Sequence, residues 1–213
     1  MKKLLLFTLL SAFAFTAFAQ RNAKVEYWNT FHYKAKDGME QEFLKAAAIK
    51  TKKFNSDSTN LIVTYRITTG DKSGVYERIM PFQTSKSYDR DASKEGKYWN
   101  DNVSPYANPD GGKQVWERLK WADVNVKPND PPYKHLSKTT FIIKPTHRNH
   151  FGRWVERIGK VFAKRMPDAS RIVMKLHSGG QRNMYVSYIG YNAFENNNPE
   201  LETTWEEDYN EMF

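Results

Sequence analysis

The sequence predicts an α+β fold made of two successive β-α-β-β-α units, each an antiparallel sheet with its helices on one face. Three observations predict it: strand-like and helix-like segments follow the same order in both halves, corresponding residues lie 109 to 110 positions apart, and a Pro-rich segment separates the halves. Lys34 thus corresponds to Lys144, and Tyr76 to Tyr185. Because four elements repeat in order, the pattern indicates an internal duplication.

The first nineteen residues have the composition of a secretory signal peptide. Lys2 and Lys3 precede an apolar run that begins at Leu4, and the run ends in an Ala-Phe-Ala sequence that suits signal peptidase. We therefore expect export to the periplasm or the medium, with cleavage before Gln20. The apolar run is shorter than the ~20 residues of a membrane span, so we expect no stable membrane insertion after cleavage.

The 213-residue chain contains no cysteine, which excludes disulfide bonds, thiolate metal sites and cysteine nucleophiles. Its net charge of +9 falls to +7 without Lys2 and Lys3, and the positive charge is dispersed along the chain. The densest basic run is only "KTKK" at residues 50–53. This pattern predicts a solvated basic surface and no nucleic-acid partner, because nucleic-acid binding needs a concentrated basic patch.

The first unit is predicted to span residues 20–126. Its residues 25–34 are rich in aromatic and β-branched types, which is typical of a strand. Two further strands, at 60–68 and 74–82, flank the hairpin sequence "TGDKSG". A helix is predicted after Gly38, because five residues recur on one of its faces: Met39, Phe43, Ala47, Lys50 and Phe54.

Residues 94–112 form an insertion that the second unit lacks, and they follow a polar, helix-prone stretch from Thr84. Their content of aromatic residues, Asn, Pro and Gly predicts an ordered loop rather than a helix. Two roles stay open. The loop caps a cavity with Tyr98, Trp99 and Tyr106, or it covers one open end of the fold.

Residues 127–136 are predicted to be a linker, because three prolines interrupt both helix and sheet. The second unit, 137–213, follows the same order as the first. Its predicted elements are a strand at 137–144, a helix at 147–166 and two strands at 170–178 and 183–191. A final helix at 199–213 has four apolar residues on one face: Leu201, Trp205, Tyr209 and Met212.

An antiparallel sheet with helices on one face leaves its other face bare. Two such sheets packed face to face hide both bare faces from water. The sequence therefore predicts a pseudo-dimeric α/β barrel formed within one chain, and it leaves any further oligomerisation open.

Two segments carry a resemblance to a known superfamily. The first is "FHYKAKDGMEQEF" at residues 31–43, with its Lys-x-x-x-Gly-x-x-x-x-Phe junction between strand and helix. The second is the aromatic residue that ends the third strand, Phe82 in one half and Tyr191 in the other. The pattern resembles the dimeric α/β-barrel superfamily with its ferredoxin-like units, in particular the antibiotic-biosynthesis-monooxygenase-like branch.

The resemblance implies a cavity between the sheets for small aromatic or haem-like ligands. Members of this superfamily oxidise phenols or quinols without a cofactor, degrade haem, act as isomerases or decarboxylases, or only bind ligands. The haem-degrading branch pairs a strand Asn and an aromatic residue with a His on the second helix. None of the five histidines falls there, and Asn29 lies two residues from the expected position, which Phe31 occupies. We therefore expect no haem and no other cofactor.

Polar side chains interrupt several of the predicted apolar strands. Buried strands rarely carry charge without a structural or functional reason. If these side chains point between the sheets, they form a pocket for a small aromatic or anionic ligand. The candidate pocket residues are Arg66, Tyr76, Arg78, Phe82, Trp99, Lys175, His177, Tyr185 and Tyr191. Two alternatives stay open: the charged side chains reach water at sheet edges, or they form an internal ion pair with Glu77.

The pattern identifies no catalytic residue and no metal site. His147 and His150 are near neighbours on the predicted helix, but they lack a third ligand on the same turn, which favours a surface or capping role. Three functions stay open. The protein binds a small ligand, acts as a cofactor-free monooxygenase-like or isomerase-like enzyme in the same cavity, or is a structural or interaction module with a filled core.

Overall fold

The structure, a computed structural model, describes residues 25–57, 60–127, 131–197 and 201–213. The predicted signal peptide at 1–19 lies outside the described residues, as does part of the predicted linker. The predicted α+β class is confirmed. The strands are β1 (Tyr27–Ala35), β2 (Val63–Arg66), β3 (Tyr76–Gln83), β4 (Ala107–Pro109), β5 (Gln114–Arg118), β6 (His135–Ile142), β7 (Ser170–Ser178) and β8 (Met184–Tyr191).

One curled sheet contains all of these strands, and every neighbouring pair is antiparallel. The order is β2-β3-β1-β5-β7-β8-β6, with β4 added beside β1. The two sheets expected to pack face to face are therefore continuous, because β5 of the first half pairs with β7 of the second. The ends of the sheet are β2 and β6, which do not pair with each other.

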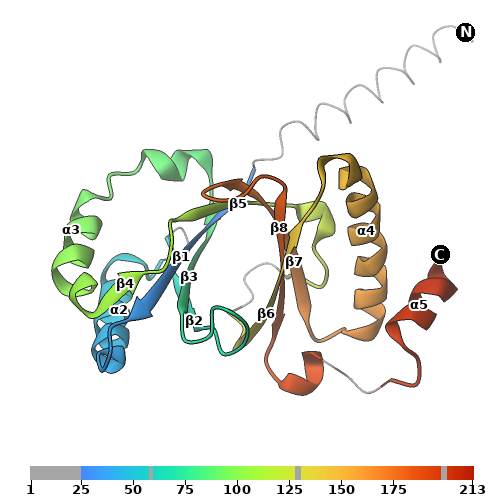
Figure 1. Cartoon of the computed structure of the whole chain (residues 1–213), viewed down its shortest axis with the longest axis horizontal. Helices are drawn as coiled ribbons and strands as arrows, with labels where there is room; N and C mark the ends of the chain where they lie inside the picture. Colours follow the sequence, from blue (N-terminus) through green and yellow to red (C-terminus); the bar gives the residue numbers. More distant parts are fainter. Residues whose placement is uncertain (1–24, 58–59, 128–130, 198–200) are drawn as a thin grey trace, which may run out of the picture.

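Helices cover the outer faces of the curled sheet (Figure 1). Helices α2 (Glu40–Phe54) and α3 (Ser93–Asn102) lie against the first half, and α4 (Arg148–Arg165) lies against the second. Helix α5 (Trp205–Met212) packs on α4 rather than on the sheet. Within the described part of the chain, no helix combines the length and the apolar character that a membrane span needs.

The prediction of a loop over 94–112 is wrong for its first part, which is helix α3. A glycine and two asparagines lower the helix propensity of this segment. Tertiary contact overrides this propensity, because the Trp99 ring lies 4.7 Å from that of Tyr33 on β1. The strand β5 was not predicted either, although it joins the two halves.

The inner face of the sheet forms one core between the halves. Its buried residues are Trp28, Ile79, Trp116, Met174, Val186 and Tyr188. They come from β1, β3, β5, β7 and β8, so both halves contribute to it. Separate apolar clusters lie under the helices, around Phe43 in the first half and around Phe162 in the second.

A buried carboxylate within this inner core forms hydrogen bonds that connect the two halves. Oε1 of Glu77 on β3 accepts hydrogen bonds from Nζ of Lys138 on β6 and from the hydroxyl of Tyr188 on β8, each at 2.7 Å. Nε2 of His32 on β1 lies 3.3 Å from the same oxygen. We call Glu77, His32, Lys138 and Tyr188 the Glu77 cluster. It spans the gap between the unpaired edges β2 and β6, where no backbone ladder closes the sheet.

Burial raises the pKa of Glu77, but the hydrogen bond from His32 and the charge of Lys138 more than offset it and hold the pKa at about 2. The carboxylate is therefore ionised at neutral pH. Next to it, burial and the charge of Glu77 raise the pKa of Tyr188 well above its usual value, so the tyrosine remains a neutral donor.

The stability of the protein should fall as the pH drops from about 4.5 towards 2. The folded-state pKa of Glu77 lies below the ordinary 4.5, so its contribution is complete above pH 4.5 and disappears as the carboxylate is protonated in the folded state. At about 1.4 kcal/mol per pKa unit, the loss is roughly 3 kcal/mol. Urea denaturation across this pH range measures it.

The variant Glu77→Gln should have a flatter pH profile in this window. The exposed residue Glu42 on α2 gives the matched control, because Glu42→Gln should keep the acid sensitivity of the natural protein. Parallel profiles for all three proteins would show that Glu77 does not connect the halves energetically.

Candidate functional site

A cavity of about 310 Å³ lies between the first half of the sheet and its helices. We call it the helix-side cavity. Its walls come from β1, β3, α2, α3 and the short helix η1 (Ser85–Asp89). The residues on which the argument below depends are Asn29, Tyr33, Lys50, Arg78, Tyr88, Arg90, Glu95, Trp99 and Lys113.

Strand alternation decides which residues reach this cavity. Asn29, Phe31 and Tyr33 on β1 point to the helices, whereas His32 between them points to the inner face. On β3, Arg78 and Met80 point to the helices, and Glu77 points inward. An ion pair between Arg78 and Glu77, one of the alternatives left open by the sequence, does not form, because adjacent residues of a strand face opposite sides of the sheet.

Arg78 is a buried cation in the wall of the cavity, with 2% of its surface exposed. Its Nη2 donates to the Thr51 hydroxyl at 2.6 Å, its Nε donates to the Thr64 hydroxyl at 3.3 Å, and its guanidinium lies 4.8 Å from the centre of the Trp99 ring. No carboxylate of the described residues forms an ion pair with it. Burial lowers the pKa of Arg78 to about 10, so the side chain stays charged at neutral pH.

The carboxylate of the cavity already has partners. Glu95 on α3 pairs with Nζ of Lys50 at 2.5 Å and with Nη2 of Arg90 at 2.9 Å. It also accepts a hydrogen bond from the Asn55 amide at 3.0 Å. Burial raises the pKa of Glu95, but the hydrogen bond and the charge of Lys50 outweigh it, so the group remains ionised. Two cations thus pair directly with this charge, whereas Glu95 acts on Arg78 through its charge alone, without an ion pair.

Two tyrosines add neutral hydrogen-bonding groups to the walls. The hydroxyl of Tyr88 donates to Oδ1 of the buried Asn29 at 2.8 Å. Nζ of Lys113 lies 5.1 Å from the centre of the Tyr88 ring. Burial raises the pKa of Tyr33 and of Tyr88, so both phenols keep their protons at neutral pH.

The cavity thus combines aromatic surface with an excess of positive charge. Four cationic side chains line it, against the single carboxylate of Glu95. Aromatic rings come from β1, η1 and α3. A partly buried site with more cations than carboxylates favours an anionic ligand, and the rings favour a flat one. The arrangement can hold a small anionic aromatic molecule and can stabilise negative charge on it.

Three of the predicted pocket residues lie together on this face. Arg78 and Trp99 line the helix-side cavity, on the helix-covered face of the sheet rather than between the halves. Tyr76 is buried on the same face against Phe43, and its hydroxyl donates to Glu40. Burial and Glu40 raise the pKa of Tyr76 to about 12.

The other predicted pocket residues are spread over the molecule. Arg66 is exposed at the end of β2 and pairs with Glu40 at 3.4 Å. Phe82 is half-exposed against Trp28, at the edge of a separate inner cavity. Tyr191 packs against His135, 5.5 Å between ring centres, and also borders an inner cleft.

Three predicted residues of the second half line neither the helix-side cavity nor the spaces on the inner face of the sheet. Tyr185 is buried under α4 against Phe151, 4.7 Å between ring centres. Lys175 is half-buried on the outer face of β7. His177 is exposed beside Tyr27 at 5.1 Å.

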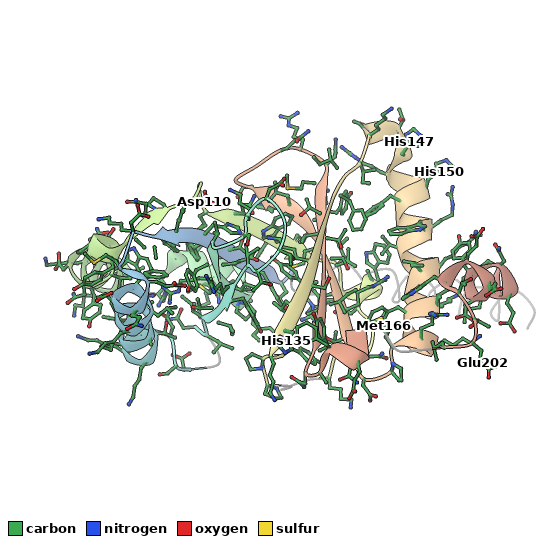
Figure 2. The ribbon with its side chains drawn as sticks, turned by 60° about the horizontal axis from the view of Figure 1, so that its bottom comes forward. Asp110, His135, His147, His150, Met166 and Glu202 are labelled. Atoms are coloured by element: carbon green, nitrogen blue, oxygen red, sulfur yellow. The ribbon has the colours of Figure 1, made fainter. Side chains whose placement is uncertain are left out.

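The histidines of the described chain do not gather around one point. Figure 2 shows His147 and His150 at the start of α4, far from His135 at the opposite end of the second half. His147 contacts the Thr146 hydroxyl at 3.0 Å, and His150 contacts Arg153 at 2.9 Å. Among the residues that the structure describes, no three acidic or histidine side chains lie close enough together to hold a metal ion.

Sequence reasoning did not identify Lys50, Tyr88, Arg90 or Glu95 as cavity residues. One signal was available: Lys50 interrupts the apolar face predicted for the first helix. A lysine on a buried helix face needs a carboxylate partner, but the sequence alone does not say which one. Arg90 and Glu95 approach Lys50 only because α3 folds back across α2.

No protein-family model matches the sequence, and no curated protein sequence matches it. Solved structures are similar in fold. A Fusobacterium nucleatum protein provisionally named a monooxygenase superposes with a TM-score of 0.64 at 12% identity, covering 89% of this chain and 86% of that protein. A Lactobacillus acidophilus protein with the same provisional name gives 0.57 at 10% identity, covering 88% and 86%.

A protein provisionally named a chlorite dismutase gives a TM-score of 0.55 at 11% identity, covering 88% of this chain and 86% of its own. At such low identity the similarity concerns the fold and not the activity. The chain therefore has the ferredoxin-like α+β-barrel fold that these proteins share.

Proposed function

We propose that the protein binds a small anionic aromatic molecule in the helix-side cavity. The observation that carries this proposal is Arg78, a buried cation that has no carboxylate partner among the described residues and stacks on Trp99. A buried charge without a directly paired counter-charge is costly, so an anionic ligand gains by supplying one. The rings of Tyr33 and Trp99 offer flat surfaces for its aromatic part.

The variant Arg78→Gln should bind 4-hydroxybenzoate about 10 to 100 times more weakly than the natural protein, as expected for the loss of a charged hydrogen bond. Binding of the uncharged analogue 4-hydroxybenzamide should change little, because its amide places no negative charge near Arg78. Isothermal titration calorimetry measures both affinities.

Lys175→Gln is the matched control, because it also removes one partly buried cation from a strand, away from the cavity. It should leave the affinity for 4-hydroxybenzoate unchanged. An equal loss in both variants would mean that general surface charge attracts the ligand. No binding by the natural protein would contradict the proposal.

A second candidate is a cofactor-free oxygenase acting in the same cavity. The observation that favours it is again Arg78, because a cation beside a bound phenol stabilises the phenolate, the form that reacts with oxygen. The provisional names of the similar structures point the same way.

An oxygen electrode tests this second candidate with 1,4-dihydroxy-2-naphthoate as the substrate. Oxygen uptake should exceed the uncatalysed rate with the natural protein and should fall by about tenfold or more with Arg78→Gln, because one electrostatic contact commonly contributes this much. Binding without oxygen uptake would support ligand binding as the function and would contradict the oxygenase hypothesis.

The third possibility, a structural or interaction module with a filled core, has less support. A cavity of about 310 Å³ lies within the size range of small-ligand pockets. Its walls carry charge that a purely structural core would avoid.

We further propose that the protein is exported and that its two halves, 20–126 and 137–213, arose by duplication. Export is supported by the sequence of residues 1–19, and duplication by the spacing of 109 to 110 residues between corresponding positions. Amino-terminal sequencing of the exported protein should give Gln20 as the first residue, and an intact Met1 would contradict export by this route.

A further inference from the structure

The inner face of the sheet encloses space of its own, separate from the helix-side cavity. An apolar cavity of about 480 Å³ has Trp28, Val63, Ile79 and Ile172 in its walls. A wider cleft of about 1010 Å³ contains all four members of the Glu77 cluster. Tyr65, Leu136 and Tyr188 border both spaces, so the two adjoin at these residues. We call the combined space the inner chamber.

The inner chamber changes from apolar to polar along its length. Aromatic and aliphatic side chains form most of the wall at its apolar end, where Glu26, Arg118, Lys120 and Lys127 also border the space. Beyond Tyr188 lie the carboxylate of Glu77 and the ammonium of Lys138, 2.7 Å apart, with His32 beside them. Of the charged groups at the apolar end, Glu26 is paired with Arg118 at 2.8 Å and with Lys120 at 3.3 Å.

The charges of the Glu77 cluster compensate each other. One carboxylate faces one ammonium, and the Tyr188 hydroxyl donates to the same carboxylate oxygen. A charged ligand group entering here would lack a free counter-charge in a largely buried site, which is costly. An uncharged hydroxyl can accept from Lys138 and donate to Glu77 without this cost.

We propose that the inner chamber binds a second ligand, an uncharged amphipathic molecule with a hydrocarbon tail and a hydroxyl head group. The tail occupies the apolar cavity beside Trp28 and Val63. The hydroxyl lies at the Glu77 cluster. Access runs through the gap between β2 and β6, because no backbone ladder closes the sheet there. This site differs in position and in ligand charge from the helix-side cavity, and it does not depend on the function proposed there.

Three unbranched ten-carbon probes test the choice of head group: 1-decanol, decanoate and decylamine, each below the concentration at which it aggregates. The natural protein should bind 1-decanol at least about ten times more tightly than either charged probe, since only the charged head groups leave a buried charge uncompensated. Equal affinities for the three probes, or no saturable binding of 1-decanol, would overturn the proposal.

Two substitutions should switch the preference in opposite directions. Lys138→Met leaves the Glu77 carboxylate without its ammonium, so decylamine should become the tightest of the three probes. Glu77→Gln leaves the Lys138 ammonium, so decanoate should become the tightest. The Lys138 side chain is a quarter exposed, so its replacement should disturb folding less than that of Glu77. Lys138→Met therefore keeps the test possible if Glu77→Gln does not fold. An unchanged order of affinities in a folded variant would overturn the assignment of the head group.

A third substitution tests the position of the tail. Val63→Trp fills the apolar cavity and should abolish 1-decanol binding while leaving 4-hydroxybenzoate binding unchanged, because Val63 does not line the helix-side cavity. Lys175→Gln should alter neither. If Val63→Trp binds 1-decanol like the natural protein, the tail does not lie in the inner chamber.

Discussion

The hydrogen bonds that Glu77 accepts inside the curled sheet hold the two halves in their relative positions. On one side the halves are joined by a backbone ladder, β5 with β7. On the other side β2 and β6 remain unpaired, and side chains connect them instead. Lys138 and Tyr188 reach Glu77 from the second half, and the Tyr65 hydroxyl donates to the carbonyl of Tyr133 at 2.7 Å. The space between the halves keeps its shape because of these contacts.

The same strand that provides this connection also serves the outer cavity. Glu77 and Arg78 are neighbours on β3, and their side chains leave the sheet on opposite faces. Both side chains are buried charges. Each would lose its polar partners, at a cost in folding free energy, if it pointed to the opposite face of the sheet. A shift of one residue in the pairing of β3 would exchange the two, which would leave the carboxylate under the helices and the guanidinium in the inner core. The register of β3 with β1 therefore determines the electrostatics of both spaces.

Much of the fold could be predicted from the periodicity of apolar residues, because this periodicity is clear in long strands and amphipathic helices. The helix around Phe43 and Ala47 and the hairpin of β7 and β8 were both predicted from it. Helix α3 was missed because its stability comes from contacts such as Trp99 with Tyr33 rather than from its own composition. The sequence did not show which face of each strand points inward. Ile172 and Met174 form an apolar stripe in the second half, but Thr64 and Arg66 at the corresponding positions of the first half are polar. Arg78 and Trp99 were predicted for a pocket between the sheets, and only the folded structure shows that both line a cavity on the helix-covered face.

The Glu77 cluster has a further consequence for symmetry. At the spacing of 109 residues that relates Tyr76 to Tyr185, the position of Glu77 corresponds to Val186, and both side chains lie on the inner face. A symmetric pair of identical subunits would place two carboxylates across the same interior, where they would repel each other. A single chain avoids this, because it can carry the acid on one side and the valine on the other. Two identical polypeptides could therefore form this interior only by bringing two carboxylates together.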